Sequence, residues 1–467
     1  MFSVFRRGAA RLAAVSLASG LLATGAMALA GPAAADESHL GTGGATAKLG
    51  GLTDYGPVNI EEKDGSKWSV GRAGLFEMRT GQGGTLSTYC IDLRTGARQD
   101  FHYKEVGWDQ SSLHDNGDAG KILWVLENSY PKVAVADLAK KVGAKNLDAN
   151  DAAAGTQAAI WHFSDRVTAT PTDPDAKLLT DYLLGRAESL QEPKESLALS
   201  PASVAGRSGD RVGPVTVATN ASTVSLALAP GAPAGVRIVD ADGRPVENAA
   251  NGDRVFLDVP AGTPDGSAEL TARATTGVPL GRAFVSTDGP SQTLVLAGSS
   301  DAAVTAKASA SWAKKGAVPA VTAATDCAKG GVDVTATNQG DEPWTFTLKG
   351  ARYTVAPGGT KTVTVPVAED ASYDLTVTGP NGFEETFRGV LDCRTAAPGT
   401  KPSTAPSATP APTASADQVT GSTTGGGDLA ETGGSSATPM IAGAAALLVV
   451  VGGGAVFLLR RRSASGR

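Results

Sequence analysis

The alternation of apolar and polar residues predicts short β-strands over much of the chain. Two segments, 196–312 and 320–394, have apolar residues at every second position, in runs separated by turns that contain Gly or Pro. The clearest runs are 214–218, 224–228 and 254–259 in the first segment and 332–336, 344–348, 361–365 and 373–377 in the second. This spacing is typical of β-sandwiches, so we expect two all-β, immunoglobulin-like domains.

The region 36–195 has a different pattern, in which a strand and several helices alternate. Residues 85–93 alternate as a strand does, which places Cys90 on the face opposite Tyr89 and Ile91. Helical spacing of apolar residues occurs further along the same region. We therefore expect a mixed α+β domain over 36–195.

Three helices are predicted in that domain. One covers 151–161, where Asp148 or Asn150 is the expected N-cap. The others cover 118–128 and the residues after the Asp173-Pro174 pair, which is a favourable helix start. Their apolar residues have core spacing, so we expect the last two to be structural.

Both ends of the chain resemble segments for export and anchoring. Residues 1–35 combine early arginines, an apolar stretch and a run of alanines, which predicts a signal peptide removed before Asp36. Residues 395–428 are rich in Thr, Ser, Pro and Gly and predict a disordered stalk. The uncharged stretch 440–459 is long enough for a transmembrane helix, and the basic tail 460–467 predicts a cytoplasmic end.

Length, composition and charge narrow the function classes. A chain of 467 residues exceeds one ordinary core, and 58 Gly, 26 Pro and only 5% aromatic residues favour short strands and turns. The net charge is −6, yet no acidic residue precedes Asp36 or follows Glu431, so the body of the chain is more acidic than the whole. This charge argues against a nucleic-acid partner.

The three cysteines divide into a pair and a single residue. Cys327 and Cys393 bracket the last predicted sandwich, and we expect a disulfide between them because the protein is exported. Cys90 is left over. An unpaired cysteine in an exported protein is unusual, and burial as an inert side chain or an intermolecular disulfide remains an alternative to a reactive role.

Gln157 offers a chemical partner for Cys90. On the predicted helix it shares a face with Ile160 and Trp161, and burying its amide is unfavourable unless another group uses it. If the sulfur of Cys90 attacks the Gln157 side-chain carbonyl, ammonia leaves and an internal thioester forms. Tyr89 and Trp161 would shield that bond from water, and an outside amine could capture the glutamyl group.

The residues around this pair resemble the thioester domains, or TQXA domains, of Gram-positive surface adhesins. The resemblance covers roughly 40–195 and depends on the segments 89–92 (Tyr-Cys-Ile-Asp) and 156–161 (Thr-Gln-Ala-Ala-Ile-Trp). It implies a Cys90–Gln157 cross-link, no catalytic turnover, no cofactor and an amine-bearing protein or polymer as covalent target. The residues expected around the bond are Tyr89, Asp92, Thr156, Trp161 and His162.

A second resemblance concerns wall anchoring. Leu429-Ala430-Glu431-Thr432-Gly433 is similar to a sortase sorting signal, with alanine at the place where proline is usual. That variant resembles the signal of class E sortases, which implies Thr432 as the end linked to peptidoglycan. We therefore expect a cell-wall protein of a Gram-positive bacterium, bound to the membrane only as a precursor.

The sequence also contains residues of the kinds found in Cys-His catalytic sites and in calcium loops. A Cys-His hydrolase or transamidase would need His102 or His162 beside Cys90, with Asp92 or Asp165 as the orienting acid. We expect a binding protein instead of such an enzyme.

A calcium loop at 114–118 is disfavoured because Gly117 takes a ligand position, so we expect a turn there and no metal site. Lysine-asparagine isopeptide bonds in the stalk domains have no candidate pair between 196 and 310.

Overall fold

The computed structural model describes residues 43–81 and 83–394. The expected signal peptide, stalk, sorting motif, membrane span and basic tail lie outside these residues, at 1–35, 395–428, 429–433, 440–459 and 460–467. Within the described ranges, no helix is both long and apolar enough to cross a membrane.

The first part of the fold is a closed ring of strands. Strand β1 pairs with β2 and β4, β2 with β3, β3 with β15, and β14 with both β15 and β4. Strand β5 adds to the far end of β1. The strands are β1 (Gly44–Glu61), β2 (Lys67–Thr80), β3 (Thr85–Cys90), β4 (His102–Val106), β5 (Thr168–Pro171), β14 (Ala283–Ser286) and β15 (Leu294–Ser299).

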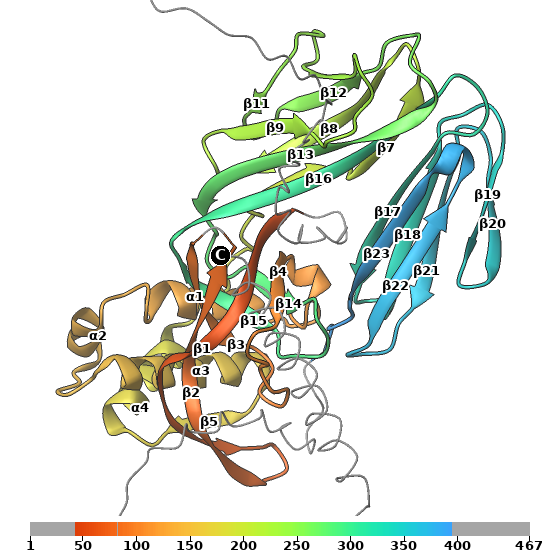
Figure 1. The fold of residues 1–467 in the computed structure, drawn as a ribbon. Coiled ribbons are helices and arrows are strands. Elements are labelled where there is room, and N and C mark those ends of the chain that lie inside the picture. The colour runs from red at the N-terminus through yellow and green to blue at the C-terminus, as the bar shows by residue number, and fades with distance from the viewer. Residues whose placement is uncertain (1–42, 82, 395–467) are drawn as a thin grey trace, which may run out of the picture. The chain divides into compact units, whose positions relative to one another are not determined.

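Four helices gather beside β1 and β2, as Figure 1 shows. They are α1 (Ala119–Asn128), α2 (Val135–Val142), α3 (Ala149–Ser164) and α4 (Pro174–Arg186). The three predicted helices are confirmed, whereas the short α2 was not predicted. Asp148 caps α3 by accepting a hydrogen bond from the Asp151 N–H at 2.9 Å, and Asp173 caps α4.

Helix α3 can lie close to its neighbours because much of its surface is built from small residues. Ala152, Ala153 and Ala154 are all buried, and a Cβ on Gly155 would lie 2.6 Å from the Ala176 carbonyl oxygen of α4. Any side chain at position 155 would therefore collide with the backbone of α4. The close packing brings α3 against β1, β2 and β3.

The second part extends the same sheet and adds a second layer. Strand β16 pairs with β1, β13 and β7, and β9 joins β13 to β11. A separate sheet has the order β10-β12-β8-β6. The strands are β6 (Leu197–Ser200), β7 (Ser203–Arg207), β8 (Arg211–Thr219), β9 (Val224–Leu228), β10 (Arg237–Val239), β11 (Asn248–Ala249), β12 (Arg254–Asp258), β13 (Gly266–Gly277) and β16 (Asp301–Ala313).

The expected boundary between 36–195 and 196–312 needs correction. Strands β14 and β15 belong by sequence to the second segment, yet they complete the ring of the first by pairing with β4 and β3. Alternation identifies a strand and its buried face but says nothing about which distant strand it pairs with. The two regions therefore share one sheet and are mixed α+β followed by β-rich structure.

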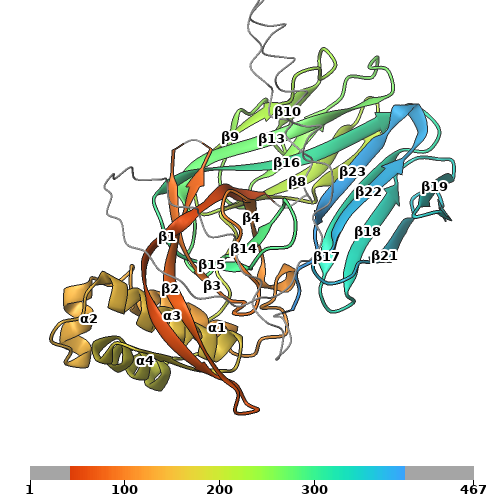
Figure 2. The same ribbon diagram turned by 60° about the horizontal axis from the view of Figure 1, so that its bottom comes forward.

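The last part is a sandwich over the predicted segment 320–394 (Figure 2). One sheet has the order β17-β18-β21, and two hairpins, β19-β20 and β22-β23, accompany it. The Cys327–Cys393 disulfide is confirmed, with 5.3 Å between the two Cα atoms. The strands are β17 (Pro319–Asp326), β18 (Gly331–Asn338), β19 (Trp344–Leu348), β20 (Ala351–Val355), β21 (Thr360–Pro366), β22 (Ser372–Thr378) and β23 (Glu384–Val390).

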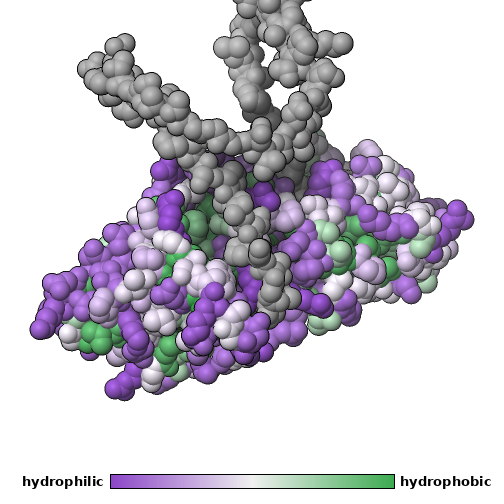
Figure 3. Space-filling view, turned by 90° about the horizontal axis from the view of Figure 1, so that it is seen from below, coloured by the Kyte–Doolittle hydropathy of each residue, from purple (hydrophilic) through white to green (hydrophobic). Residues whose placement is uncertain are grey.

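Large apolar side chains are scarce on the surface of the described residues. Figure 3 shows one face on which hydrophilic side chains predominate and apolar ones form small, separate groups. Among residues 43–81 and 83–394, Leu178 is the single large apolar side chain that counts as exposed. Recognition through a broad apolar patch is therefore not favoured on the face shown.

We predict that the disulfide contributes strongly to the stability of the last sandwich. The two cysteines are 66 residues apart in sequence, and in the chain-entropy model a cross-link over such a loop contributes about 4 kcal/mol. Urea unfolding of the Cys327→Ser/Cys393→Ser double variant should show a loss of this size. A loss below about 0.5 kcal/mol, typical of surface substitutions, would contradict this prediction.

Candidate functional site

The site is built around Cys90, the last residue of β3. Its side chain is buried, and it packs in a different apolar cluster from Tyr89 and Ile91. The predicted opposition of these residues on the strand is therefore confirmed. Cys90 is unpaired and lies opposite Leu294 of β15 in the ladder.

Gln157 of α3 holds the main chain of Cys90. Its Oε1 accepts a hydrogen bond from the Cys90 N–H at 3.0 Å, and its Nε2 donates to the Cys90 carbonyl oxygen at 2.9 Å. Gln157 is completely buried, and Cys90 is the hydrogen-bond partner of both polar groups of its side chain. A buried amide requires such hydrogen-bond partners. Here the partners are the main-chain groups of Cys90 and not its sulfur.

Gln292 is the glutamine that faces the sulfur. The Cys90 thiol donates to Gln292 Oε1, with 2.7 Å between the two atoms. Since a carbonyl bond is about 1.23 Å long, Gln292 Cδ lies within about 3.9 Å of Sγ. Gln292 Nε2 donates to the main-chain carbonyl oxygen of Asp92. The Tyr103 hydroxyl donates to the main-chain carbonyl oxygen of Gln292 at 3.1 Å.

The expected geometry of the Cys90–Gln157 pair is corrected by these contacts. The two residues do meet, but the carbonyl beside the sulfur belongs to Gln292, which the sequence pattern did not single out. Gln292 lies two residues before the run 294–297, in which every residue is apolar and buried. The sequence signal that could have indicated Gln292 is a polar residue next to a strand that is buried on both faces.

Tyr89, Trp161, Thr156 and Asp92, the other non-histidine residues expected at the site, are all buried. Tyr89 is buried and donates its hydroxyl to the Tyr130 carbonyl oxygen at 2.8 Å, and Trp161 lies in the same apolar cluster as Cys90. Thr156 bonds within α3, from Oγ1 to the Ala152 carbonyl oxygen at 2.7 Å. Asp92 is buried, and its carbonyl oxygen reaches Gln292.

The two histidines are placed for other contacts. His162 is exposed, with Nδ1 3.2 Å from the Val167 carbonyl oxygen, and exposed His102 pairs with Asp288 Oδ2 at 2.8 Å. Within the described part of the chain, neither ring hydrogen-bonds the sulfur of Cys90. A Cys-His catalytic pair is therefore not assembled in this arrangement. The segment 114–118 forms turns before α1.

Burial controls the charge state of the site. It raises the pKa of the Cys90 thiol well above its usual value, and the negative charges of Asp92 and Asp165 add to this. Burial also raises the pKa of Asp165 to about 7, although hydrogen bonding by Ser164 and the charge of Arg94 oppose the shift. A neutral thiol is a weaker nucleophile than a thiolate.

Two family models match parts of the chain. Residues 87–189 match the model described as "Thioester domain", a range that contains Cys90 and Gln157 and ends before Gln292. Residues 319–390 match "Bacterial phospholipase C, C-terminal domain" and correspond to the last sandwich. No curated protein matches the chain.

Several solved structures are similar to the chain at low sequence identity. The Bacillus anthracis TIE protein is 14% identical over 75% of this chain and 81% of that chain, with a TM-score of 0.27. The thioester domain of the Staphylococcus aureus TIE protein is 14% identical over 57% and 99%, with a TM-score of 0.25. An N-terminal thioester domain of a surface protein from Clostridium perfringens is 15% identical over 31% and 89%, with a TM-score of 0.21. The family match, and not these scores, shows that the chain carries a thioester domain.

We predict that Asp165 makes stability fall as the pH rises from about 4 to 7. Its folded pKa of about 7 exceeds the unfolded value of 3.8, so the folded state binds the extra proton in this window. The slope from one group is at most about 1.4 kcal/mol per pH unit. In urea titrations across this range, Asp165→Asn should remove that slope, while Glu188→Gln, at an exposed position, should retain it. An unchanged slope in Asp165→Asn would exclude this assignment.

Proposed function

We propose that this protein is a surface adhesin whose thioester domain forms an internal bond between Cys90 and Gln292 and captures an amine on a target. The observation that carries the proposal is the 2.7 Å contact between Cys90 Sγ and Gln292 Oε1 inside a buried site. The match of 87–189 to the thioester domain model supports the same chemistry.

The bond-forming step needs no external reagent. Cys90 Sγ attacks Gln292 Cδ, a C–S bond forms, and the bond from Cδ to Nε2 breaks. The thiol proton leaves with the nitrogen, so the by-product is ammonia. The Asp92 carbonyl oxygen accepts a hydrogen bond from Nε2 and so holds the leaving nitrogen in place. Holding the reacting atoms together replaces an intermolecular encounter by an intramolecular step.

Gln157 is a positioning residue in this proposal. Its two hydrogen bonds fix the backbone of Cys90, and with it the direction in which Sγ projects from β3. Trp161 is buried in the same apolar cluster as Cys90 and limits the access of water to the sulfur, whereas Tyr89 packs on the opposite face of β3. A thioester shielded in this way hydrolyses slowly, yet it still reacts with a stronger nucleophile that reaches it.

The capture step is a single event for each molecule. A lysine amine of the target attacks Gln292 Cδ, an amide forms, and the sulfur leaves as the Cys90 thiol. The product cannot return to the thioester without replacing the new amide, so the protein binds covalently and does not turn over. The acidic body of the chain favours the approach of a cationic amine.

Surface anchoring is the second element of the proposal. The signal segment 1–35 directs export, and the span 440–459 holds the precursor while a class E sortase cleaves within 429–433 and joins Thr432 to peptidoglycan. The stalk 395–428 then carries the folded part outward. The target is an amine-bearing protein or polymer on another surface.

We predict that the intact mass of the purified protein is lower than the sequence mass by one ammonia, beyond the two disulfide hydrogens. Cys90→Ala and Gln292→Ala should both remove the ammonia deficit, because each lacks one end of the bond. Gln339→Ala, a matched change at an exposed glutamine, should retain it. Methylamine should add its own mass to the ammonia-deficient form, so that the product exceeds the sequence mass, corrected for the disulfide, by one CH2 group.

Gln157→Ala separates the roles of the two buried glutamines. It leaves the Cys90 N–H and carbonyl without partners and should destabilise the fold by about 2–6 kcal/mol, since each unpaired group costs about 1–3 kcal/mol. The folded fraction should still lose ammonia, because both ends of the bond remain, but more slowly, because the backbone of Cys90 is no longer held. If the unmodified protein shows no ammonia deficit and has a free thiol at Cys90, the thioester is absent and the protein is an inert stalk protein. Turnover of a substrate by Gln292→Ala would instead indicate a cysteine-dependent enzyme.

A further inference from the structure

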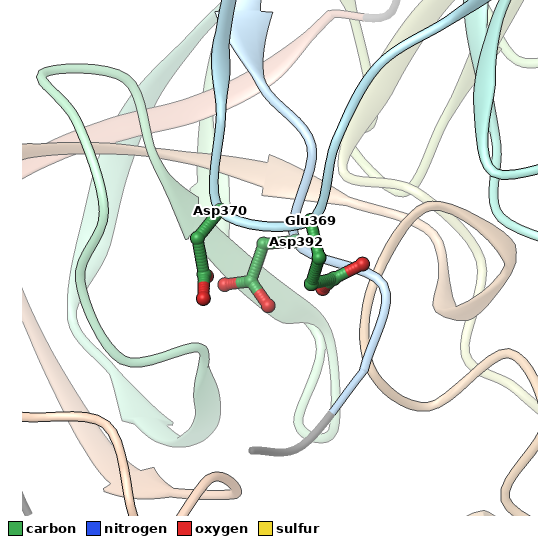
Figure 4. A group of neighbouring side chains, drawn as sticks. All are labelled: Glu369, Asp370 and Asp392. Carbon is green, nitrogen blue, oxygen red and sulfur yellow. The ribbon is translucent and has the colours of Figure 1, made fainter. Parts of the chain in front are cut away.

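Three carboxylates meet where the last sandwich touches the segment that carries Gln292. Glu369, Asp370 and Asp392 each offer an oxygen, and these oxygens lie within 4.8 Å of one another. Figure 4 shows Asp392 between the other two side chains. Glu369 and Asp370 are exposed, whereas Asp392 is buried.

Backbone pairing fixes the three residues relative to one another. The Asp370 N–H donates to the Leu391 carbonyl oxygen at 2.8 Å, which places the turn at 369–371 beside the segment that contains Asp392. Glu369 Oε1 accepts from the N–H groups of Cys393 and Arg394 at 2.7 and 2.8 Å. A carboxylate used in this way still has its second oxygen available.

Asp392 gives an independent indication of a ligand. Only 4% of its surface is exposed. One oxygen, Oδ2, accepts a hydrogen bond from the Thr293 hydroxyl, while the buried Oδ1 has no hydrogen-bond partner among the described residues. A buried polar atom without a partner is unfavourable, and such atoms usually have an ion or a water in place of a protein group.

The surrounding charges favour a cation at that position. Three carboxyl groups whose oxygens lie within 4.8 Å of one another repel when they are ionised, and a divalent cation between them would reverse the sign of that interaction.

We propose that Glu369, Asp370 and Asp392 bind one calcium ion. All the donors are hard carboxylate oxygens, which suit Ca²⁺, and the exposure of Glu369 and Asp370 leaves space for the waters that complete its coordination. Zinc sites in proteins are built mainly from Cys sulfur and His nitrogen, and the adjacent Cys393 is held in a disulfide.

This site would connect the last sandwich to the thioester region. Asp392 contacts Thr293, the residue after Gln292, so an ion on Asp392 restrains the chain that carries the reactive glutamine. Ion binding by Glu369, Asp370 and Asp392 does not require the thioester. The same affinity is therefore expected in Cys90→Ala, which separates failure of this proposal from failure of the proposed function.

The test is calorimetric titration of the EDTA-treated protein with CaCl₂. We expect one site per chain with a Kd on the order of 10⁻⁴ M, the range of extracellular calcium modules. Asp392→Asn should weaken binding by at least about tenfold, since ligand charge sets affinity. Asp370→Asn, at an exposed position, should do the same and covers the case in which Asp392→Asn does not fold.

Glu384→Gln is the matched control, because it removes one exposed carboxylate from the same sandwich and should leave the Kd unchanged. Addition of CaCl₂ should also raise Tm in the unmodified protein and not in Asp370→Asn. Absence of both heat and a Tm shift at about 10 mM CaCl₂, a tenfold excess over the weakest expected Kd, would overturn the proposal. Equal binding of Mg²⁺ would overturn the assignment to calcium.

Discussion

The paired hydrogen bonds between the Gln157 amide and the main chain of Cys90 are the interaction on which the site depends. They join α3 to the end of β3 at a point where both are buried, and a backbone N–H and carbonyl there would otherwise lack partners. The small residues of α3 follow from the same constraint, because a glutamine side chain reaches the strand only if the helix lies close to it. Once the backbone of Cys90 is held, its sulfur projects toward Gln292.

Local features of the site were predictable from the sequence. The Asp148 cap and the helical spacing identified α3, and alternation placed Cys90 opposite Tyr89 and Ile91. The unfavourable burial of a lone glutamine correctly indicated that the polar groups of Gln157 have a partner. It did not indicate whether that partner is the sulfur or the backbone of Cys90, because both lie on the same residue.

Gln292 was not predictable in the same way. It enters the site because β15 pairs with β3 across some 200 residues of chain. Alternation is absent from the first four residues of β15, which are all buried, so no local pattern assigns it to the ring or to the following sandwich. The Cys327–Cys393 disulfide, in contrast, followed from counting, because two cysteines bracketed one predicted domain. The acidic cluster at Asp392 likewise depends on a contact between distant segments, through Thr293.

The most direct test of the central claim is to locate the adduct after the protein has reacted with methylamine. Tandem mass spectrometry of the digested protein should find the methylamide on residue 292, a free thiol at Cys90 and an unmodified Gln157. A methylamide on residue 157 would show that the sulfur exchanges partners and that the hydrogen-bonded glutamine is the reactive one. Either that result or the absence of any adduct would contradict the assignment of the thioester to Cys90 and Gln292.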